Sequence, residues 1–516
     1  MGNKKLGVRV AVIGSGPSGA IAAKNLIDSG VTVHMLDVGI GLKNQDHIKQ
    51  CALFPDEEKG LMPKKSLFGD YYPYARGDYL RGHVTDNISF DTSHSRGGLS
   101  NVWGATVGLP YPKDLEEWPI DIEEFNNDIS YVFDFIEVAS SVDLIDSLYP
   151  YKYIGKDFIY QGDQTQYILN RVNNNKEALL KRKIYVGKSK LAVKSNQSIN
   201  NRCVLCYGCL SGCRSNSIFS SKSIIDDLIK NSHFKYRPNT LVKSFCENDN
   251  SIEIKYQDLE NTQEYSASYD YLILAAGCFD TLKILNKSSY LPENKAQIKD
   301  SQKYYFLAFT LHPNKGSPPQ TISLAHLYIQ TLDSYGNLVQ GQLYPGGEIL
   351  KQILVRKFGI FIGHILAVLL RPILSRALIG MVYLNSNISG SIKIHFSDEH
   401  NVTLDAKFNP QAHSEFLLTM RKYIKNFHYL GFFTIPFIFL KSKIGHSQHF
   451  GASLPMTFPE DPQEMSSDVF GRPLGLKKVF VVDSTVLPNI PASPTTSLIM
   501  GNAKRISDHL IKVIIG

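Results

Sequence analysis

A glycine-rich turn near the N-terminus constrains the fold of this chain more than any other feature. Residues 10–13 (Val-Ala-Val-Ile) have the composition of a buried strand, and Gly14-Ser-Gly16-Pro-Ser-Gly19 follows directly and opens a helix. Gly14 suits the tight turn, Gly16 lets the backbone approach a diphosphate, and Gly19 allows close packing of helix on strand. Asp37 ends the next strand, 18 residues after Gly19, where a carboxylate can accept a hydrogen bond from an adenosine ribose. The pattern predicts a Rossmann-type unit that binds a dinucleotide at the helix N-terminus.

Composition narrows the class of protein further. The 516 residues suffice for two or more domains, and 43% hydrophobic and 20% charged residues are typical of a globular chain. The net charge of +7 is dispersed, without the Lys/Arg-rich tract of a nucleic-acid-binding protein, so no nucleic-acid partner is expected. The first residues lack the apolar segment of a signal peptide, which favours a cytoplasmic location.

Three later segments resemble motifs of the glucose–methanol–choline (GMC) oxidoreductase superfamily. Residues 95–105, Ser-Arg-Gly-Gly-Leu-Ser-Asn-Val-Trp-Gly-Ala, resemble the Gly-Gly-x-Ser loop that passes the flavin in that superfamily. Residues 271–278 resemble the strand and glycine turn that close its FAD domain, and 481–488 resemble its Val-x-Asp-x-Ser-x-x-Pro segment. The glycine fingerprint occurs once, whereas pyridine-nucleotide-dependent flavin reductases carry two. The resemblance implies one tightly held FAD, with Asp483 at its diphosphate or ribitol.

Two details resemble the sugar-oxidising, pyranose-oxidase-like branch of this superfamily. They are Trp103 in the Gly-Gly loop and the sequence Glu-Trp-Pro-Ile at 117–120. Pyranose oxidases carry a His just before this Trp and bond it to the flavin, whereas this chain has Val102. The FAD is therefore expected to be non-covalent.

The resemblance implies an α/β fold, in which a Rossmann-like FAD-binding domain (three-layer β-β-α/α-β-α) carries an inserted α+β substrate domain built on an antiparallel sheet. The FAD-binding domain is expected at 1–300 plus 440–516, and the substrate-binding domain at 300–440. Hydropathy patterns predict helices at 121–139, 215–232 and 497–515, and strands at 237–257, 269–276, 325–332, 391–396, 401–408 and 479–482. The residues expected at the cofactor are Gly14, Gly16, Ser18, Gly19, Asp37, Gly97, Gly98, Ser100, Trp103, Val242, Ala276, Gly277, Asp483, Ser484, Pro494 and Thr495.

The superfamily also places a catalytic histidine in a His-Gly-Thr segment shortly before the last strand of its FAD domain. The corresponding segment here, 445–456, holds His446 and His449, and the resemblance favours His449 as general base with His446 as the alternative. Oxidation of an alcohol moves a hydride to the flavin while the hydroxyl proton leaves, and a neutral imidazole is a suitable acceptor for that proton. The superfamily's second polar residue, an Asn or His, is replaced by Ser493. Its hydroxyl can hydrogen-bond a substrate oxygen but cannot serve as a base near neutral pH.

Four cysteines lie within eleven residues, at Cys203, Cys206, Cys209 and Cys213. The C-x₂-C-x₂-C-x₃-C spacing is that of bacterial ferredoxins, although Arg214 stands where ferredoxins carry Pro. The spacing leaves two interpretations open. The cysteines ligate an iron–sulfur cluster that carries electrons away from the flavin, or they are structural or redox-labile thiols.

Two apolar runs, at 358–370 and 431–440, are too short to span about 30 Å of hydrocarbon as helices. The first is expected to be a buried helix of a large domain. The alternative rests on its flanking Lys and Arg residues, since a basic-flanked apolar helix can lie in a membrane interface. In that case the chain would sit peripherally at the inner face of a membrane.

Together these features predict an FAD-dependent oxidoreductase that acts on the CH–OH group of an alcohol, most simply a sugar or sugar-like secondary alcohol. One alternative is a long-chain or sterol alcohol dehydrogenase at a membrane surface. Another, of a different class, is a non-catalytic flavin/iron–sulfur electron-transfer protein. The electron acceptor is left open among O₂, a quinone and a redox protein.

Overall fold

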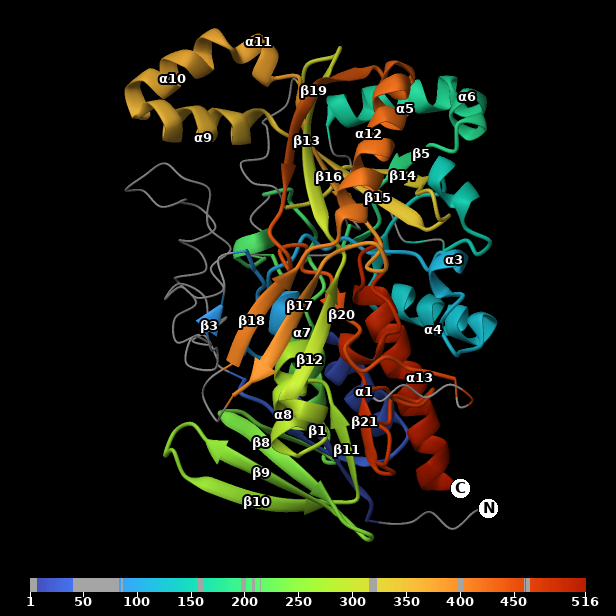
Figure 1. The fold of residues 1–516 in the computed structure, drawn as a ribbon, viewed down its shortest axis with the longest axis vertical. Helices are drawn as coiled ribbons and strands as arrows, with labels where there is room; N and C mark the ends of the chain where they lie inside the picture. Colours follow the sequence, from blue (N-terminus) through green and yellow to red (C-terminus); the bar gives the residue numbers. More distant parts are fainter. Residues whose placement is uncertain are drawn as a thin grey trace.

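A computed structural model describes residues 7–39, 83–84, 87–153, 155, 162–195, 201–206, 209–213, 215–314, 323–397, 402–458, 460 and 465–516 (Figure 1). The glycine turn belongs to a parallel sheet of five strands in the order β21-β11-β1-β2-β7. The strands are β1 (Arg9–Ile13), β2 (Thr32–Leu36), β7 (Phe234–Arg237), β11 (Tyr271–Leu274) and β21 (Val479–Val481). The strands β1, β11 and β21 are apolar along nearly their whole length because both faces of the sheet are covered there, whereas the edge strand β7 is Phe-Lys-Tyr-Arg.

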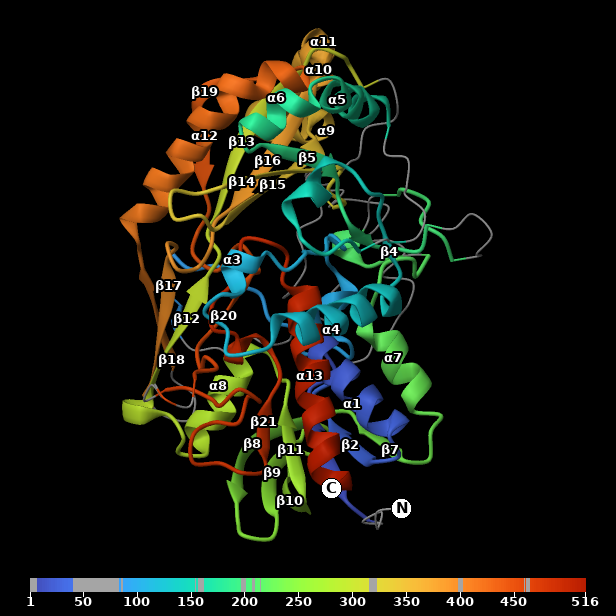
Figure 2. The same ribbon diagram turned by 90° about the vertical axis from the view of Figure 1, so that its right-hand side faces the viewer.

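Helices cover one face of this sheet, and a second sheet lies against the other. Helix α1 packs against α13, which in turn packs against α4 (Figure 2). An antiparallel sheet of β8, β9 and β10 contacts β1 and β2, which completes three layers. These elements are α1 (Pro17–Asp28), α4 (Ile122–Phe135), α7 (Ser221–Leu228), α8 (Cys278–Lys287), α13 (Thr496–Ile515), β8 (Thr240–Glu247), β9 (Ile252–Asp258) and β10 (Glu264–Tyr269).

A six-stranded antiparallel sheet in the order β19-β13-β16-β15-β14-β5 forms the second half of the molecule. Helix α12 packs on one face of it, where Phe416 stacks on Tyr304 with ring centroids 4.2 Å apart. The elements are β5 (Tyr185–Lys188), β13 (Lys303–Thr310), β14 (Leu327–Leu332), β15 (Leu338–Pro345), β16 (Ala377–Tyr383), β19 (Phe432–Lys441), α5 (Asp163–Asn174), α6 (Lys176–Lys181) and α12 (Pro410–Leu430).

The second core takes in a segment outside the 300–440 range expected from the sequence. Strand β5 pairs with β14, and α5 and α6 contribute apolar side chains to the same cluster as α12. Strand β5 has only four residues, so it carries too little alternation for its pairing to be predicted.

A mixed sheet in the order β20-β12-β17-β18-β3 lies between the two halves (Figure 1). Strand β12 of this mixed sheet ends at Asp300, and β13 of the six-stranded sheet begins at Lys303. The chain therefore passes from one sheet to the other within three residues. The strands are β3 (His83–Val84), β12 (Lys295–Asp300), β17 (Ser391–Phe396), β18 (Val402–Lys407) and β20 (Phe450–Gly451).

The apolar run at 358–370 is not the buried helix expected from the sequence. It lies in a helical hairpin of α9 (Gly347–Phe358), α10 (Ile360–Leu369) and α11 (Arg371–Leu374), and α10 buries only Gly363 and Ala367. The buried interpretation is wrong because the run projects beyond the sheet, and hydropathy alone does not show what lies next to it. Within the described residues, no helix is both long and apolar enough to cross a bilayer.

Candidate active site

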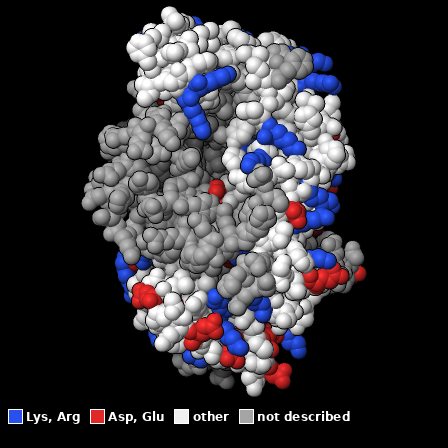
Figure 3. Space-filling view, turned by 60° about the vertical axis from the view of Figure 1, so that its left-hand side comes forward, with Lys and Arg blue, Asp and Glu red and all other residues white. Residues whose placement is uncertain are grey.

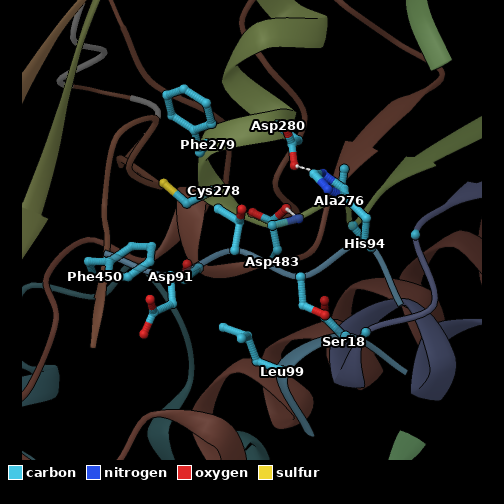
Figure 4. A pocket seen from close by; sticks show the side chains of 18 of the residues that line it. Ser18, Asp91, His94, Leu99, Ala276, Cys278, Phe279, Asp280, Phe450 and Asp483 are labelled. Atoms are coloured by element: carbon cyan, nitrogen blue, oxygen red, sulfur yellow. Dashed lines mark hydrogen bonds and ion pairs between the residues drawn. The ribbon is translucent and has the colours of Figure 1, made fainter. Parts of the chain in front are cut away.

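A cavity of about 1790 Å³ lies at the carboxyl ends of the parallel strands and extends to the six-stranded sheet. This is the edge at which open α/β sheets bind their ligands. The volume exceeds the 300–1,000 Å³ or so of a pocket for one drug-sized ligand, so it can hold a large cofactor together with a substrate. Figure 4 shows that residues from distant parts of the chain, among them Ser18, Leu99, Ala276 and Asp483, face the same space.

The glycine turn lines one end of the cavity, and its three glycines meet different surroundings. Gly14 has φ +96°, and a Cβ on it would lie 2.5 Å from the Ala275 carbonyl oxygen. A Cβ on Gly19 would lie 2.1 Å from the Gly14 carbonyl oxygen, so this glycine permits the close packing of α1 on β1. A Cβ on Gly16 would meet nothing within 4 Å, and Gly16 is the N-cap of α1. The free N–H groups of α1 therefore begin beside open space, which suits a diphosphate.

Asp37 lines the cavity directly after β2 and is buried. Its Oδ2 accepts hydrogen bonds from the Ser15 hydroxyl and from the Tyr236 hydroxyl, the latter at 2.8 Å. Burial raises the pKa of this carboxyl, and the two hydroxyl hydrogen bonds oppose that rise. The acid expected at a ribose thus has its side chain fixed by two neighbours that the sequence analysis did not identify.

The Gly-Gly loop is held against the glycine turn and against the start of α7. The Gly97 amide donates to the Ser15 hydroxyl at 2.9 Å, and the Ser221 amide donates to the Ser100 hydroxyl at 2.9 Å. Gly97 has φ +93°, a conformation that favours glycine. The Trp103 indole donates to the Phe219 carbonyl oxygen at 2.9 Å, which fixes its ring at the cavity wall.

Asp483 joins the end of β21 to the turn after β11. Its Oδ2 accepts from the Gly277 amide at 3.0 Å and from the Thr281 hydroxyl at 2.5 Å. Its Oδ1 accepts from the Thr485 amide at 3.0 Å and from the Thr485 hydroxyl. Burial raises the pKa of Asp483, and these donors oppose the rise. The carboxylate therefore holds two cavity-lining segments together, in addition to lining the cavity itself.

The histidine segment is pinned to the segment after β21. A Cβ on Gly451 would lie 2.3 Å from the Ser484 carbonyl oxygen, and the Ala452 amide donates to that oxygen at 2.8 Å. Two non-glycine residues with positive φ flank His449, namely Gln448 at +64° and Ala452 at +53°. Such backbone strain is concentrated at functional sites, because the surrounding structure must hold it in place.

His449 reaches the cavity from this segment and stacks on Tyr383, with ring centroids 4.9 Å apart and planes 27° from parallel. His446 also lines the cavity, and its Nδ1 lies 3.4 Å from the Tyr305 hydroxyl. The Lys303 ammonium lies 5.2 Å from the centre of the Tyr305 ring and 5.8 Å from that of Tyr383. The two histidines thus face an aromatic wall that carries one cation.

That wall is one face of the six-stranded sheet, the face opposite α12. Side chains two residues apart on three neighbouring strands point the same way. They are Lys303 and Tyr305 on β13, Gln342 and Tyr344 on β15, and Met381 and Tyr383 on β16. The Tyr344 hydroxyl donates to Gln342 Oε1 at 2.6 Å, while Gln342 Nε2 has no hydrogen-bond partner among the described residues.

Most residues expected from the sequence line this cavity, and a few do not. Gly14, Gly16, Ser18, Asp37, Gly98, Ser100, Trp103, Val242, Ala276, Gly277, Asp483, Ser484, Pro494, Thr495, His446 and His449 all line it. Gly19 and Gly97 lie behind the lining as packing and turn residues. Ser493 does not line the cavity either: its Cβ lies 2.8 Å from the position that a Cβ on Gly108 would take. Its buried hydroxyl has no hydrogen-bond partner in the described part of the chain.

Sequence reasoning missed a hydrogen bond between a histidine and an aspartate in the cavity wall. His94 Nε2 lies 2.9 Å from Asp280 Oδ2, and Figure 4 shows the two side chains meeting beside Ala276. The residues are 186 positions apart, and neither belongs to a motif that the sequence analysis used. The same holds for Asp91, whose Oδ2 accepts from the side-chain Nε2 of Gln448 at 2.7 Å and which also lines the cavity.

The four clustered cysteines lie outside the cavity lining, and the expectation that they ligate an iron–sulfur cluster gains no support. Within the described residues, no group of three or more His, Cys, Asp or Glu side chains is placed to hold a metal ion. Cys206 is exposed, Cys209 is buried, and Cys203 and Cys213 are half-buried. Three of them pack instead in a small apolar cluster beneath Trp103.

The environments of these cysteines also shift the pKa of their thiols in different directions. Burial would raise the pKa of the Cys213 thiol, but hydrogen bonds from Ser217, Ile218 and Ser215 outweigh it and lower the pKa. Burial raises the pKa of Cys209 well above its ordinary value. Cys213 is therefore more readily ionised than Cys209.

Comparison with protein-family models gave no match, and neither did comparison with curated proteins. Among solved structures, pyridoxine 4-oxidase from Mesorbium loti matches with a TM-score of 0.62, over 97% of this chain and 99% of that one. The chain has the fold of this oxidase. The predicted fold class, α/β with a three-layer Rossmann-like domain and a second domain built on an antiparallel sheet, is thereby confirmed. At 12% identity the likeness concerns the fold and selects no branch or substrate.

Proposed function

We propose that this protein is an FAD-dependent oxidoreductase that oxidises the CH–OH group of an alcohol. The observation that carries the proposal is the single cavity that joins the glycine turn to His449. One end offers helix N–H groups and a buried acid, as a dinucleotide requires, and the other offers an imidazole on an aromatic wall. The fold shared with a solved oxidase supports the same reading.

The residues present fit a non-covalent FAD. The space beside Gly16 is open to a diphosphate, Asp37 stands where a ribose is expected, and Gly98 approaches the same turn. A Cβ on Gly98 would lie 3.4 Å from the Gly16 backbone, so a side chain there would narrow the same space. Val102, at the position of the covalent histidine of pyranose oxidases, is buried and offers no bonding atom.

When bound, the flavin would supply the hydride acceptor for the alcohol carbon. The chain's own task is to take the hydroxyl proton and to fix the reacting oxygen. We propose that His449 accepts the hydroxyl proton of the alcohol. Tyr383 sets the orientation of its ring, and Ser447 and Gly451 fix its backbone. His446 is the alternative base, and Ser493 is left without a catalytic role because it does not line the cavity.

The wall facing the histidines suits a polar, ring-shaped substrate rather than a long alkyl chain. Gln342 Nε2 can donate to a substrate oxygen, Lys303 supplies a positive charge, and Tyr305 and Tyr383 offer faces for a flat or sugar-like ring. The solved neighbour is named as an oxidase of pyridoxine, a small hydroxylated ring. We therefore propose a sugar or another small hydroxylated ring compound as the substrate.

The proposal is tested by anaerobic reduction of the bound flavin. The purified protein, mixed without O₂ with a panel of sugars, pyridoxine, other small ring alcohols and long-chain alcohols, should lose its flavin absorbance with a polar ring alcohol. If only long-chain alcohols reduce the flavin, the substrate is a long-chain alcohol and not a polar ring compound. If no alcohol reduces the flavin and a reduced protein partner does, the molecule is an electron-transfer protein. Re-oxidation by O₂, a quinone or a redox protein then identifies the acceptor.

A second test assigns the base. His449→Ala should retain FAD but reduce the flavin at least about 100-fold more slowly, the usual contribution of a general base. His446→Ala should have a much smaller effect. His395→Ala, which changes an exposed histidine on β17 outside the cavity, is the matched control and should leave the rate unchanged. A greater loss in His446→Ala than in His449→Ala would transfer the role to His446.

A further inference from the structure

In the helical hairpin α9–α11, helix α10 exposes its large apolar side chains and buries the small residues Gly363 and Ala367. It leaves the six-stranded sheet after β15 and returns at β16, and Figure 1 shows it standing away from the sheets. Gly359, with φ +82°, turns the chain between α9 and α10. A Cβ on Gly363 would lie 2.3 Å from the Val355 Cα, so the two helices cross in close contact. The hairpin is therefore a packed unit in which α10 turns its small residues Gly363 and Ala367 inward, toward α9.

The outer face of α10 is formed by six large apolar residues. Phe361 is 79% exposed, Val368 71% and Leu369 69%. The others are Ile360, Ile362 and Ile365. A surface helix of a water-exposed domain shows the opposite pattern, with its apolar side chains toward the core. Small residues at a helix contact with large apolar residues outside are typical of helices surrounded by lipid.

The apolar surface continues onto the sheet at the root of the hairpin. Leu311, which follows β13, and Phe433 on the edge strand β19 are 63% and 51% exposed. Both lie at the end of the sheet where β16 begins, because Phe309 pairs with both Ala377 and Phe433. Ile435, two residues along β19, is exposed as well. Exposed apolar side chains therefore occur at the root of the hairpin as well as on α10, and large exposed apolar areas mark interaction surfaces.

Basic side chains surround this apolar surface. Residues 347–376 contain Lys351, Arg356, Lys357, Arg371 and Arg376, against the single carboxylate of Glu348. That carboxylate is paired with Lys351 at 2.9 Å. Figure 3 shows the upper end of the molecule as largely uncharged, with Lys and Arg side chains along its margin.

We propose that the hairpin docks this protein onto an anionic lipid bilayer, with α10 lying in the membrane interface. Ten residues of helix rise about 15 Å, half of a hydrocarbon core of about 30 Å, so α10 can lie in the surface but cannot span it. The basic margin then meets anionic headgroups. A second copy of the chain is the weaker occupant, since a two-fold contact through α10 would bring the same basic side chains together without acidic partners.

The strands that carry the hairpin also carry the substrate wall. Gln342 and Tyr344 lie on β15 before α9, and Met381 and Tyr383 lie on β16 after α11. The docking proposal does not depend on the proposed function, because vesicle binding is measured without flavin or substrate.

Vesicle flotation of the full chain tests the proposal. The protein should float with vesicles of phosphatidylcholine mixed with phosphatidylglycerol, and more weakly with phosphatidylcholine alone. The triple variant Phe361→Ser, Ile365→Ser, Val368→Ser should lose at least about tenfold in partition, because each lost apolar side chain removes several buried carbons. The control Ile229→Ser, Leu474→Ser, Val513→Ser changes three exposed apolar residues elsewhere and should float as the wild type does. Circular dichroism should show the same fold for both variants.

A variant with fewer basic residues separates the electrostatic contribution to vesicle binding from the contribution of the apolar side chains. Arg356→Gln with Lys357→Gln should weaken binding to the anionic vesicles about tenfold or more, since each basic residue near such a surface contributes about fivefold. Binding to phosphatidylcholine should not change. The proposal is overturned if the wild type does not float, or if the triple variant floats as well as its control. It is also overturned if the lipid-free wild type is a dimer that the triple variant converts to a monomer.

Discussion

The imidazole of His449 lies on the ring of Tyr383, with the two centroids 4.9 Å apart. The residues come from different sheets: His449 immediately precedes β20, and Tyr383 ends β16. Burial raises the pKa of the Tyr383 hydroxyl well above its ordinary value, so the residue is a neutral surface against the imidazole. The stack fixes the plane of the proposed base relative to the end of the cavity that the glycine turn lines.

Removal of this ring should slow the proposed reaction without preventing FAD binding. Tyr383→Leu is expected to lower the rate of anaerobic flavin reduction about tenfold, because aromatic stacking contributes about 0.5–1.5 kcal/mol. Tyr383→Phe keeps the ring and should stay within about threefold of the wild type on the same scale. Stopped-flow absorbance of the flavin gives both rates. Equal losses in the two variants would show that the hydroxyl, not the stack, is what matters.

Asp300 holds the loop that carries both histidines. The Gly445 amide donates to its Oδ2 at 3.0 Å, and the Ser447 hydroxyl donates to its Oδ1. Asp300→Ala removes both contacts and should lower kcat by about tenfold or more, since hydrogen bonds to charged groups contribute about 1.5–3 kcal/mol. Asp300→Asn can keep one acceptor and should recover part of the rate. KM and FAD content should change little in either variant, whereas loss of FAD would indicate a wider structural role.

Two glycines of the N-terminal turn should separate folding from cofactor binding. A Cβ on Gly16 meets no protein atom within 4 Å, and its φ of −60° is open to alanine. Gly16→Ala should therefore leave the flavin-free protein as stable as the wild type but weaken FAD binding about tenfold or more. Gly19→Ala places a Cβ 2.1 Å from a backbone oxygen and should cost about 1–3 kcal/mol of folding free energy.

Thermal unfolding with and without added FAD distinguishes the Gly16→Ala and Gly19→Ala variants. Bound ligand raises the midpoint in proportion to its affinity. The Gly16 variant should start at the wild-type midpoint and rise less, and the Gly19 variant should start lower. If FAD raises the unfolding midpoint of the Gly16 variant as much as that of the wild type, the diphosphate does not bind at this turn.

Local motifs predicted the parts of the site that depend on backbone conformation. Gly14 and Gly97 need positive φ, and Gly19 and Gly451 need close backbone contact, so the sequence must keep glycine at those positions. The parts formed by side chains from distant elements were not predicted. His94 and Asp280 meet across 186 residues, and nothing local in either segment indicates the other.

The substrate wall illustrates a different limit. Lys303 and Tyr305, Gln342 and Tyr344, and Met381 and Tyr383 show the alternation of a strand, but alternation does not say which face meets a cavity. The run at 358–370 shows the same limit for helices. Its hydropathy is that of a buried helix, and only the small residues Gly363 and Ala367 indicate that the large ones face outward.

Alkylation of the four clustered cysteines tests whether they are free thiols or ligands of an iron–sulfur cluster. As free thiols, the exposed Cys206 and the lower-pKa Cys213 should react with iodoacetamide well before the buried Cys209. Peptide mass spectrometry of anaerobically purified protein gives the order of reaction. Ligation to a cluster would protect all four cysteines together and release iron and sulfide in parallel with their alkylation.

A buried carboxyl outside the cavity lining should give the protein a pH-dependent stability. Asp114 on α3 (Pro112–Leu115) accepts from the backbone N–H of Leu338 at 3.3 Å and from the side-chain Nδ2 of Asn385 at 3.1 Å, both through Oδ1. Burial raises the pKa of this carboxyl from 3.8 to about 7. Because the folded state holds the proton more tightly than the unfolded state, the free energy of unfolding falls as pH rises from about 4 to about 7.

Asp114→Asn removes this titration and keeps the accepting oxygen. At pH 8, where the wild-type carboxyl is ionised in both states, the variant should be more stable by up to about 4 kcal/mol. At pH 4 the two proteins should be nearly equal. Urea unfolding at several pH values measures the difference, and Glu177→Gln, an exposed change on α6, is the control for a lost charge. A variant that is less stable than the wild type at pH 8 would mean that the ionised carboxylate has stabilising partners that outweigh its burial.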